Sequence, residues 1–455
     1  MTEFPSNRPV RNLPRKTACV IGAGPNGLAA AIVLAHAGLQ VEVFEAEPQP
    51  GGAVRTLELT LPGFHHDFGS AVHPMAAGSP FFNALPLQDY GLEWVHSPAA
   101  LAHPFDDGTA VLLERSFDEM QKALGEDGAA WRRLMEPFAA KWPELTRDIL
   151  RPLLTFPHNA FLLARFGMDA LPSAHFVATR RFRTERARAL FAGFAGHSFL
   201  RLDQPISASF GLVMGASAHA VGWPIARGGS QAITNALTAY LKTLGGKITT
   251  SARIESLRQL PACDVVMCDV TPRQLLNLSD GRFSPSYAKE LRSYRYGPGV
   301  FKVDYALSSP IPWTAAECLR AATVHLGATM QEIAASEAAV SHGKVSERPF
   351  VLLAQPTLFD PSRAPDGKHI AWAYCHVPNS SKVDCLKALE NQIERFAPGF
   401  RDCVLARRVF SPADLESMDA NLVGGDIGGG SVDIRQFLFR PTWRQYRTSA
   451  KTIYL

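Results

Sequence analysis

The chain has 455 residues, of which 46% are hydrophobic and 19% are charged, a balance that describes a globular protein with a sizeable core and at least two domains. The net charge of +4 is too small to indicate a nucleic-acid partner. The longest apolar stretch is too short to cross a bilayer, and the first 16 residues lack the apolar core of a secretory signal. We therefore expect a cytoplasmic protein that begins with a flexible tail over residues 1–15.

A glycine-rich turn follows the first predicted strand. Cys19–Ile21 is a short apolar run typical of a buried parallel strand, and Gly22, Gly24 and Gly27 then complete the pattern G-x-G-x-x-G. The first glycine permits a tight turn, the second lets a pyrophosphate approach the backbone, and the third lets the next helix pack against the sheet. The pattern is typical of a dinucleotide-binding turn, although a glycine turn without a ligand shares it.

The elements after the turn strengthen this interpretation. A helix is predicted to start at Pro25, where a missing N–H has no cost, and to stop at Gly38, which suits a left-handed backbone. Gln40–Phe44 is the next predicted strand, and Glu45 follows it 23 residues after the first glycine, close to the expected interval of about 20. A carboxylate there accepts hydrogen bonds from ribose hydroxyls and repels a 2′-phosphate.

A second glycine turn lies close behind. Gly51 and Gly52 are followed by Arg55, and a guanidinium beside a glycine turn suits a phosphate or an electron-rich ring. Asp67 and Gly69 then offer a further acid and glycine. In this order the motifs resemble those of the flavin-containing amine oxidase and phytoene desaturase superfamily.

This resemblance implies that the dinucleotide is FAD. It places Glu45 at the adenosine ribose, the turn from Gly51 to Arg55 along the pyrophosphate and flavin, and Asp67 near the isoalloxazine. It also implies that Ile254 faces the adenine through its backbone. The residues assigned to the cofactor are Gly22, Gly24, Pro25, Asn26, Gly27, Glu45, Ala46, Gly51, Gly52, Arg55, Asp67, Gly69 and Ile254.

The chain from Ser116 to about Phe210 is predicted to be mostly helical, after a hairpin turn at Phe105–Thr109. Ten of the 27 phenylalanines lie between Phe138 and Phe210, which fits an apolar cavity and an aromatic-rich helical core equally well. Five arginines lie between positions 180 and 188. A solvated helix face explains them, and so does attraction to an anionic membrane surface or substrate.

The dinucleotide-binding part is predicted to resume near residue 222. A helix, a strand pattern over Lys247–Leu257 and a buried strand over Asp264–Cys268 follow. Cys263 and Cys268 have a spacing found in redox-active pairs. However, an offset of five along a strand puts the sulfurs on opposite faces and roughly 16 Å apart, so we predict free thiols.

Val300–Leu307 alternates like a strand and carries Lys302. The segment resembles the amine oxidase strand whose lysine points through a water at flavin N5, which makes Lys302 the candidate catalytic residue. Phytoene desaturases generally lack this lysine, and an exposed strand lysine is the alternative. His73, His197 and His219 lack the spacing of metal ligands, so we predict core or surface histidines and no metal.

The last part of the chain carries a third resemblance. A glycine-rich stretch over Asn421–Gly430 and the basic and aromatic residues after it resemble the phytoene-dehydrogenase-related oxidoreductases within the superfamily. Members of that group continue past the position of Leu455 with a glycine turn and a helix that close over the flavin. We therefore expect a truncated chain whose final strand, Lys451–Leu455, lies in the FAD-binding sheet. The residues after the glycine-rich stretch that carry the match are Arg435, Arg440, Pro441, Trp443 and Arg447.

Together these patterns predict an α/β flavoprotein with a Rossmann-like FAD-binding domain and an inserted, mostly helical plus β-sheet substrate domain. The FAD-binding domain would comprise residues 16–75, 220–295 and 410–455, and the substrate domain residues 76–219 and 296–409. The predicted enzyme moves a hydride from an apolar small-molecule substrate to flavin, with peripheral membrane contact as a further expectation and an unknown oligomeric state. The alternatives are a flavin amine oxidase and a flavin-free binding protein similar to Rab GDP-dissociation inhibitors, against which the complete Gly51–Arg55 motif argues.

Overall fold

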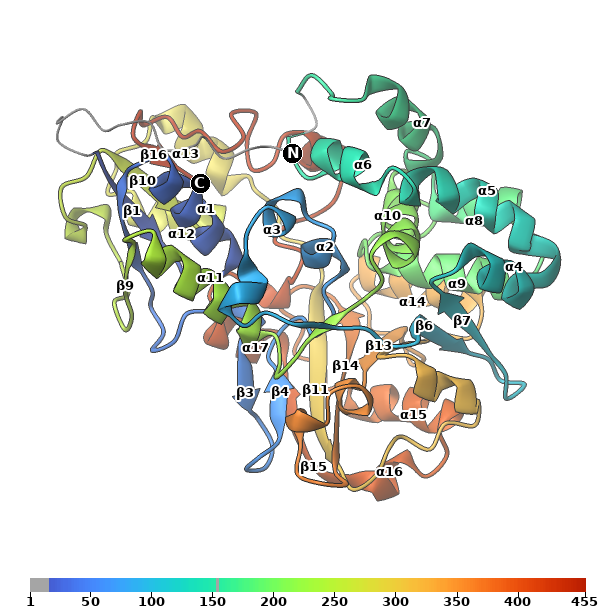
Figure 1. Ribbon diagram of the computed structural model, residues 1–455. Helices are drawn as coiled ribbons and strands as arrows, with labels where there is room; N and C mark the ends of the chain where they lie inside the picture. The colour runs from blue at the N-terminus through green and yellow to red at the C-terminus, as the bar shows by residue number, and fades with distance from the viewer. Residues whose placement is uncertain (1–15, 153–154) are drawn as a thin grey trace.

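Two β-sheets with helices on their faces organise the chain, as the computed structural model in Figure 1 shows. The structure describes residues 16–152 and 155–455. The predicted flexible tail over residues 1–15 lies outside the described residues. A five-stranded sheet lies on the left of the view, a seven-stranded sheet lies below the centre, and a group of helices lies at the upper right.

The five-stranded sheet is parallel and has the order β16-β10-β1-β2-β9. Its strands come from distant parts of the chain: β1 (Thr17–Ile21), β2 (Gln40–Phe44), β9 (Lys247–Thr249), β10 (Val265–Cys268) and β16 (Ile453–Tyr454). Apolar side chains of α1 (Pro25–His36) and α11 (Gln231–Thr243) pack on one face, and those of α12 (Pro272–Leu278) and α13 (Pro285–Arg292) pack on the other. The predicted Rossmann-like α/β unit is therefore confirmed.

Two predicted strands are shorter than expected. The strand pattern over Lys247–Leu257 ends at Thr249, because the chain turns away at Ser251, whose φ is +53°, and the Ala252 N–H donates to the carbonyl of Glu45. The final strand lies in the parallel sheet as predicted, where it pairs with β10, but it includes only Ile453 and Tyr454.

The seven-stranded sheet has the order β15-β11-β14-β13-β12-β6-β7 and is antiparallel except between β12 and β6. The predicted hairpin turn at Phe105–Thr109 joins β6 to β7 and is confirmed. The strands are β6 (Ala99–Pro104), β7 (Ala110–Glu114), β11 (Gly299–Leu307), β12 (Thr323–Leu326), β13 (Val351–Ala354), β14 (His369–Val377) and β15 (Val404–Phe410).

Strand β11 is buried over its whole length, and its side chains alternate between two environments. Phe301, Val303 and Tyr305 belong to the core beneath α15 (Leu386–Phe396) and α16 (Phe400–Cys403). Lys302 and Asp304 must therefore face the opposite side, toward the hairpin of β3 (Thr56–Glu58) and β4 (His65–Asp67). Because side chains alternate along the strand, the two ionisable side chains of β11 lie together on one buried face of the sheet.

The predicted helical region is confirmed as seven consecutive helices. Two of them pack closely, because Gly211 of α10 (Ser207–Ala220) leaves room for the Phe191 ring of α9 (Glu185–Gly196), from which an added Cβ atom would lie only 2.7 Å. No helix of the described residues is long and apolar enough to cross a membrane. The seven are α4 (Phe117–Leu124), α5 (Gly128–Ala139), α6 (Trp142–Ile149), α7 (Ala160–Ala170), α8 (Ala174–Arg181), α9 (Glu185–Gly196) and α10 (Ser207–Ala220), and α14 (Met330–Ser341) packs against α9.

Short elements make the remaining connections. The pairs β3–β4 and β5–β8 form two small antiparallel sheets. All seven cysteines are free thiols, as predicted for Cys263 and Cys268. The short elements are β3 (Thr56–Glu58), β4 (His65–Asp67), β5 (Trp94–Val95), β8 (Ile225–Ala226), α2 (Pro74–Ala77), α3 (Pro80–Asn83), α17 (Pro412–Met418) and α18 (Ile434–Leu438).

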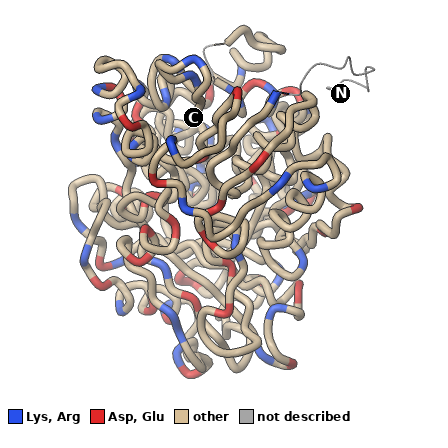
Figure 2. Tube along the Cα trace, turned by 90° about the vertical axis from the view of Figure 1, so that its left-hand side faces the viewer, with Lys and Arg blue, Asp and Glu red and all other residues tan. Residues whose placement is uncertain are grey.

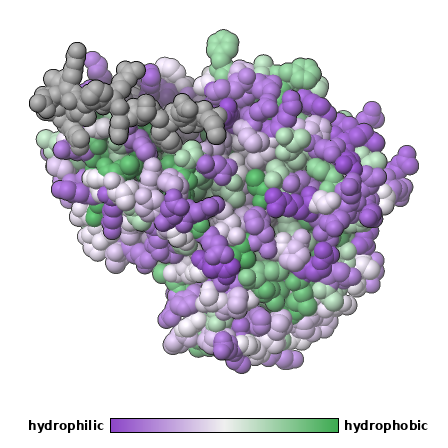
Figure 3. Space-filling model, viewed as in Figure 1, coloured by the Kyte–Doolittle hydropathy of each residue, from purple (hydrophilic) through white to green (hydrophobic). Residues whose placement is uncertain are grey.

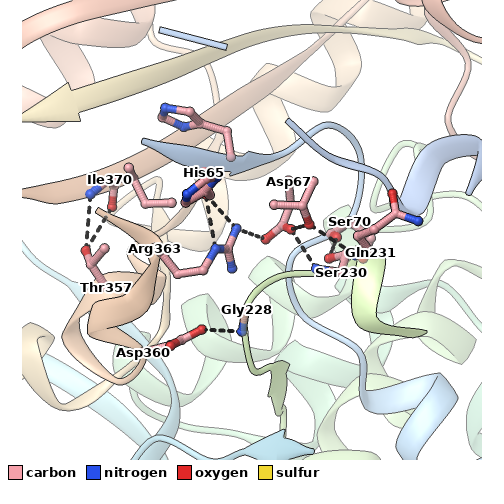
Figure 4. A network of polar contacts seen from close by, with 12 residues as sticks. His65, Asp67, Ser70, Gly228, Ser230, Gln231, Thr357, Asp360, Arg363 and Ile370 are labelled. Carbon is pink, nitrogen blue, oxygen red and sulfur yellow. Dashed lines mark hydrogen bonds and ion pairs between the residues drawn. The ribbon is translucent and has the colours of Figure 1, made fainter. Parts of the chain in front are cut away.

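A buried ion pair ties the β3–β4 hairpin to the rest of the molecule (Figure 4). The guanidinium of Arg363 lies 2.8 Å from Asp67 Oδ2 and also donates to the carbonyl of His65. Asp67 Oδ1 accepts from the Thr56 hydroxyl and from the Ser230 N–H. Each side chain of the ion pair is about 1% exposed, so each charge depends on the other for compensation.

We expect Arg363→Met to lower the free energy of unfolding by about 3–5 kcal/mol, because it leaves the Asp67 carboxylate buried without its cation. Arg258→Met is the matched control, since its side chain is 75% exposed and its pair with Asp280 is worth less than about 1 kcal/mol. Chemical denaturation followed by circular dichroism measures both variants. Equal losses in the two variants would contradict a special role for the buried pair.

Candidate cofactor and active site

A long groove runs past the carboxyl ends of β1, β2 and β10, the edge at which open α/β sheets bind ligands. Two cavities of about 320 Å³ and 920 Å³ form it. Gly24, Gly52, Asp269 and Asp419 line both cavities, which shows that the two meet at the glycine turns. The groove can therefore hold one elongated ligand.

The smaller cavity contains the residues assigned to the adenosine end. Glu45, Ala46 and Ile254 line it together. Glu45 Oε2 accepts from the Ala23 N–H at 2.7 Å, and Oε1 accepts from the Glu47 N–H at 2.9 Å. These bonds fix the carboxylate beside the first glycine turn, and each oxygen keeps a lone pair for a ribose hydroxyl.

The two glycine turns meet where a pyrophosphate has to pass. A Cβ atom at Gly27 would lie 2.1 Å from the carbonyl oxygen of Gly22, so α1 can approach β1 this closely only with glycine at this position. A Cβ atom at Gly52 would lie 3.3 Å from Gly24 Cα and would narrow the passage. Pro25 and Asn26 line the larger cavity beside them. Because the cradle is open only without side chains, these residues fit the pyrophosphate of FAD.

The other residues assigned to the flavin support the turns from behind. Arg55 lines the smaller cavity, but its Nε donates to the carbonyl of Gly52 and its Nη2 to that of Met418. Neither Asp67 nor Gly69 lines the two cavities. Asp67 pairs with Arg363, and a Cβ atom at Gly69 would lie 2.3 Å from the Ala53 carbonyl oxygen. Gly51, with a φ of +154°, packs against the side chain of Arg55.

The groove also contains an acid, Asp269, that was not among the predicted cofactor residues. Asp269 follows β10, and its Oδ2 accepts from the Gly27 N–H at 2.8 Å, one of the helix N-terminal donors on the phosphate path. Burial, together with the nearby carboxylates of Asp419 and Glu45, raises the pKa of Asp269 to about 6, against the lowering effect of the Gly27 hydrogen bond. Its position after an apolar strand, the same as that of Glu45 after β2, was the available signal.

The far wall of the larger cavity comes from the glycine-rich stretch near residue 425. Asp426 holds this stretch in place, because its carboxylate accepts from the N–H groups of Gly297 and Gly428 at 2.7 and 2.8 Å. The Tyr294 hydroxyl donates to the carbonyl of Gly429. Residues far apart in the chain thus close one side of the groove.

Lys302 is buried, so the alternative of an exposed strand lysine is wrong. Its ammonium pairs with Asp304 and lies 5.7 Å from the Trp372 ring centre and 5.3 Å from that of Phe410. Burial lowers the pKa of Lys302 and raises that of Asp304, while their mutual attraction opposes both shifts. The other Asp304 oxygen lies 3.6 Å from His66 Nδ1, and burial lowers the pKa of His66 to about 3, so this histidine is neutral.

Lys302 lies near the second glycine turn but does not line either cavity of the groove. Aromatic rings connect the two places: Phe410 contacts Phe68 edge to face at 5.9 Å, and the Arg55 guanidinium lies over Phe68 at 5.1 Å. We call the buried surface formed by Lys302, Asp304, Trp372, Tyr374 and Phe410 the aromatic face of the sheet.

The three histidines considered in the sequence as possible metal ligands bond to neighbouring side chains instead. His73 bonds to the Ser230 hydroxyl, His197 to His325, and His219 accepts from the Trp131 indole N–H. His73 and His219 are buried, as predicted for core histidines. The described residues include no group of three or more side chains arranged to hold a metal ion.

The parallel sheet, its glycine turns and the groove define a dinucleotide-binding α/β protein. A sequence model of the family described as flavin containing amine oxidoreductase matches residues 26–371, well over half of the chain. The chain belongs to this family. It is a FAD-dependent oxidoreductase, and FAD supplies the hydride acceptor when it is bound.

Two curated proteins and one solved structure illustrate the relationship. Pyridine nucleotide-disulfide oxidoreductase domain-containing protein 2 of Mus musculus is 26% identical over 97% of this chain and 89% of its own length. Phytoene dehydrogenase of Streptomyces griseus is 27% identical over 85% of this chain and 77% of its own. Putrescine oxidase bound to putrescine matches the fold with a TM-score of 0.58 at 16% identity, over 97% of this chain and 93% of its own. The predicted resemblance to the phytoene desaturase and amine oxidase superfamily is confirmed.

We expect FAD to bind less tightly as the pH rises above 6, because Asp269 then ionises beside the path of the anionic pyrophosphate. Cofactor binding should raise the pKa of Asp269 and take up a proton. Asp269→Asn keeps an oxygen for the Gly27 N–H and removes the charge, so it should bind FAD about tenfold more tightly than the wild type at pH 8 and equally well at pH 5.

Titration of the apoprotein with FAD, followed by fluorescence quenching at both pH values, measures this difference. Asp264→Asn is the matched control, because Asp264 lies at the opposite end of β10 and accepts from the Thr17 N–H. The same pH dependence in wild type and Asp269→Asn would rule out Asp269 as the titrating group.

Proposed function

We propose that this enzyme oxidises an apolar small molecule. The substrate loses a hydride from a C–H bond to FAD and a proton from the adjacent carbon to a base or water, and it gains a C=C double bond. Phytoene dehydrogenase, a relative that aligns with most of the chain, is named for such a substrate. We further propose a cytoplasmic enzyme without a nucleic-acid partner. The free cysteines and the mixed signs of charge over the face in Figure 2 support this location and this absence.

The observation that carries the proposal is that ionisable side chains near the aromatic face are already bonded to one another. Lys302 pairs with Asp304, and His376 bonds to Glu337 at 2.9 Å. The surface between them consists of rings, with Trp372 and Tyr374 stacked at 5.4 Å. An apolar substrate needs no charged partner, whereas an amine needs a free carboxylate or an open aromatic cage. Here an ammonium of the protein already lies over the rings.

Amine oxidation is the second candidate. Two observations favour it: Lys302 is buried on β11, the strand whose sequence resembles the lysine-bearing strand of amine oxidases, and the fold is shared with putrescine oxidase. In that case a carboxylate on the aromatic face would have to be free to bind the amine of the substrate. Asp304 is the carboxylate on that face, and it is paired with Lys302.

Anaerobic bleaching of the bound flavin distinguishes the two candidates. We expect polyenes and other apolar C–H donors to bleach the visible absorbance of the FAD-loaded enzyme, and putrescine and longer amines to leave it unchanged at the same concentrations. Bleaching by amines alone would overturn the proposal in favour of amine oxidation.

We also propose that Lys302 handles a proton beside the flavin. Lys302→Met keeps the side-chain length but leaves Asp304 without its cation, so the double variant K302M/D304N is measured beside it. Both variants should slow flavin reduction or reoxidation at least tenfold. Stopped-flow absorbance measures the two rates, and Lys247→Met on the exposed start of β9 is the control. If the folded double variant keeps both wild-type rates, Lys302 has only a structural role.

A further inference from the structure

A cluster of large apolar side chains is exposed on α7, on α8 and in the segments next to them. We call it the α7–α8 surface. Its apolar members are Phe156, Phe161, Met168, Leu171 and Phe176, whose exposed fractions run from 97% for Phe156 to 54% for Phe176. Figure 3 shows apolar side chains projecting from the upper edge of the molecule, where Figure 1 places α7. Clusters of this kind mark interaction sites.

Helix α7 has apolar side chains on its outer face as well as on its inner face. Leu162 and Phe166 point into the core, as expected for the inner face of a surface helix. The outer face carries Phe161, Arg165 and Met168 at helical spacing. A helix at the surface of a globular protein normally has a polar outer face. Here the outer face is apolar with one cation.

The charges around the cluster are mostly positive. Residues 155–183 contain four arginines and one aspartate, a net charge of +3 within a chain whose total is +4. Asp169 is paired with Arg181 at 2.5 Å. The side chains of Arg165, Arg180 and Arg183 have no ion-pair partner among the described residues. Most of the net charge of the molecule therefore lies beside its exposed apolar cluster.

We propose that the α7–α8 surface docks on an anionic phospholipid membrane. The apolar side chains enter the boundary between headgroups and acyl chains, and the guanidinium groups contact headgroup phosphates. A cavity between the two helices is lined by Met168, Phe176, Arg180 and Arg181, so it offers cationic and apolar groups to one headgroup. The charge selects a lipid surface over an apolar protein partner, because several unpaired arginines would lose hydration against a neutral interface.

The docking surface adjoins the groove. The end of α6 at Ile149 and the next three residues, up to Pro152, line the 920 Å³ cavity. A protein docked through α7 and α8 would hold this side of the cavity near the bilayer. An apolar substrate dissolved in lipid could then enter without crossing water. This last step rests on the proposed function, whereas the docking itself does not.

Sedimentation of the FAD-loaded protein with lipid vesicles tests the docking. Two kinds of vesicle are compared: one of phosphatidylcholine alone, and one of phosphatidylcholine with 30% phosphatidylglycerol, roughly the anionic content needed for a clear surface potential. We expect binding to the anionic vesicles only, weakened by salt. The variant F161S/M168S/F176S should bind at least tenfold less, and so should R165E/R180E. The matched control V383S/L405S removes exposed apolar side chains elsewhere and should bind like the wild type.

All substituted side chains are exposed, so we expect every variant to keep its fold. Melting temperature and flavin content, measured for every variant, check this. Equal binding of F161S/M168S/F176S and wild type would overturn the proposal. So would wild-type protein that ignores anionic vesicles and instead forms a dimer that these substitutions dissociate. Flavin bleaching by a detergent-dispersed apolar substrate should be unchanged in the docking variants, so a failure of the proposed chemistry and a failure of docking are distinguishable.

Discussion

Close backbone approach between glycine turns is the constraint on which the cofactor groove depends. The first turn admits α1 next to β1 only because Gly27 has no side chain, and the passage toward the second turn stays open because Gly24 faces Gly52. Gly69 then lets the β3–β4 hairpin pack on Ala53 at the back of the second turn. The carboxylate of Glu45 and the guanidinium of Arg55 bond to the backbone of these turns. Their first effect is therefore to hold the cradle in shape.

Carboxylates in the groove partly oppose the binding of an anionic dinucleotide. Helix α1 directs N–H donors and a positive dipole end at the phosphate path, but Asp269 already accepts one of those hydrogen bonds. Glu45 and Asp419 add further negative charge nearby. A proton on Asp269 relieves this conflict, so the protonation of the apoprotein and the binding of an anionic dinucleotide are coupled.

Away from the groove, the buried charges lie in ion pairs, and a cluster of apolar side chains is exposed at the surface. Asp67 and Arg363 compensate each other at the hairpin, and Lys302 and Asp304 do so on the aromatic face. These pairs leave rings as the remaining chemistry of that face, which suits an apolar substrate. The α7–α8 surface extends the same preference to the exterior, where unpaired arginines accompany exposed apolar side chains.

The sequence alone determined the features that depend on local geometry. The turn glycines, the end of α1 at Gly38, the carboxylate after β2 and the alternation of β11 follow from backbone sterics and from side-chain periods within a few residues. The strand that begins at Lys247 is shorter than its sequence pattern predicts, since the chain leaves the sheet after Thr249 and the Ala252 N–H bonds to the carbonyl of Glu45.

Only the tertiary structure decided contacts between distant segments. It brought the Asp269 carboxylate to the Gly27 N–H, Arg363 to Asp67, and Lys302 into the interior between Trp372 and Phe410. It also left the outer face of α7 uncovered. Neither propensity nor periodicity encodes which far segments meet, because that outcome depends on how all the apolar faces of the chain are buried at once.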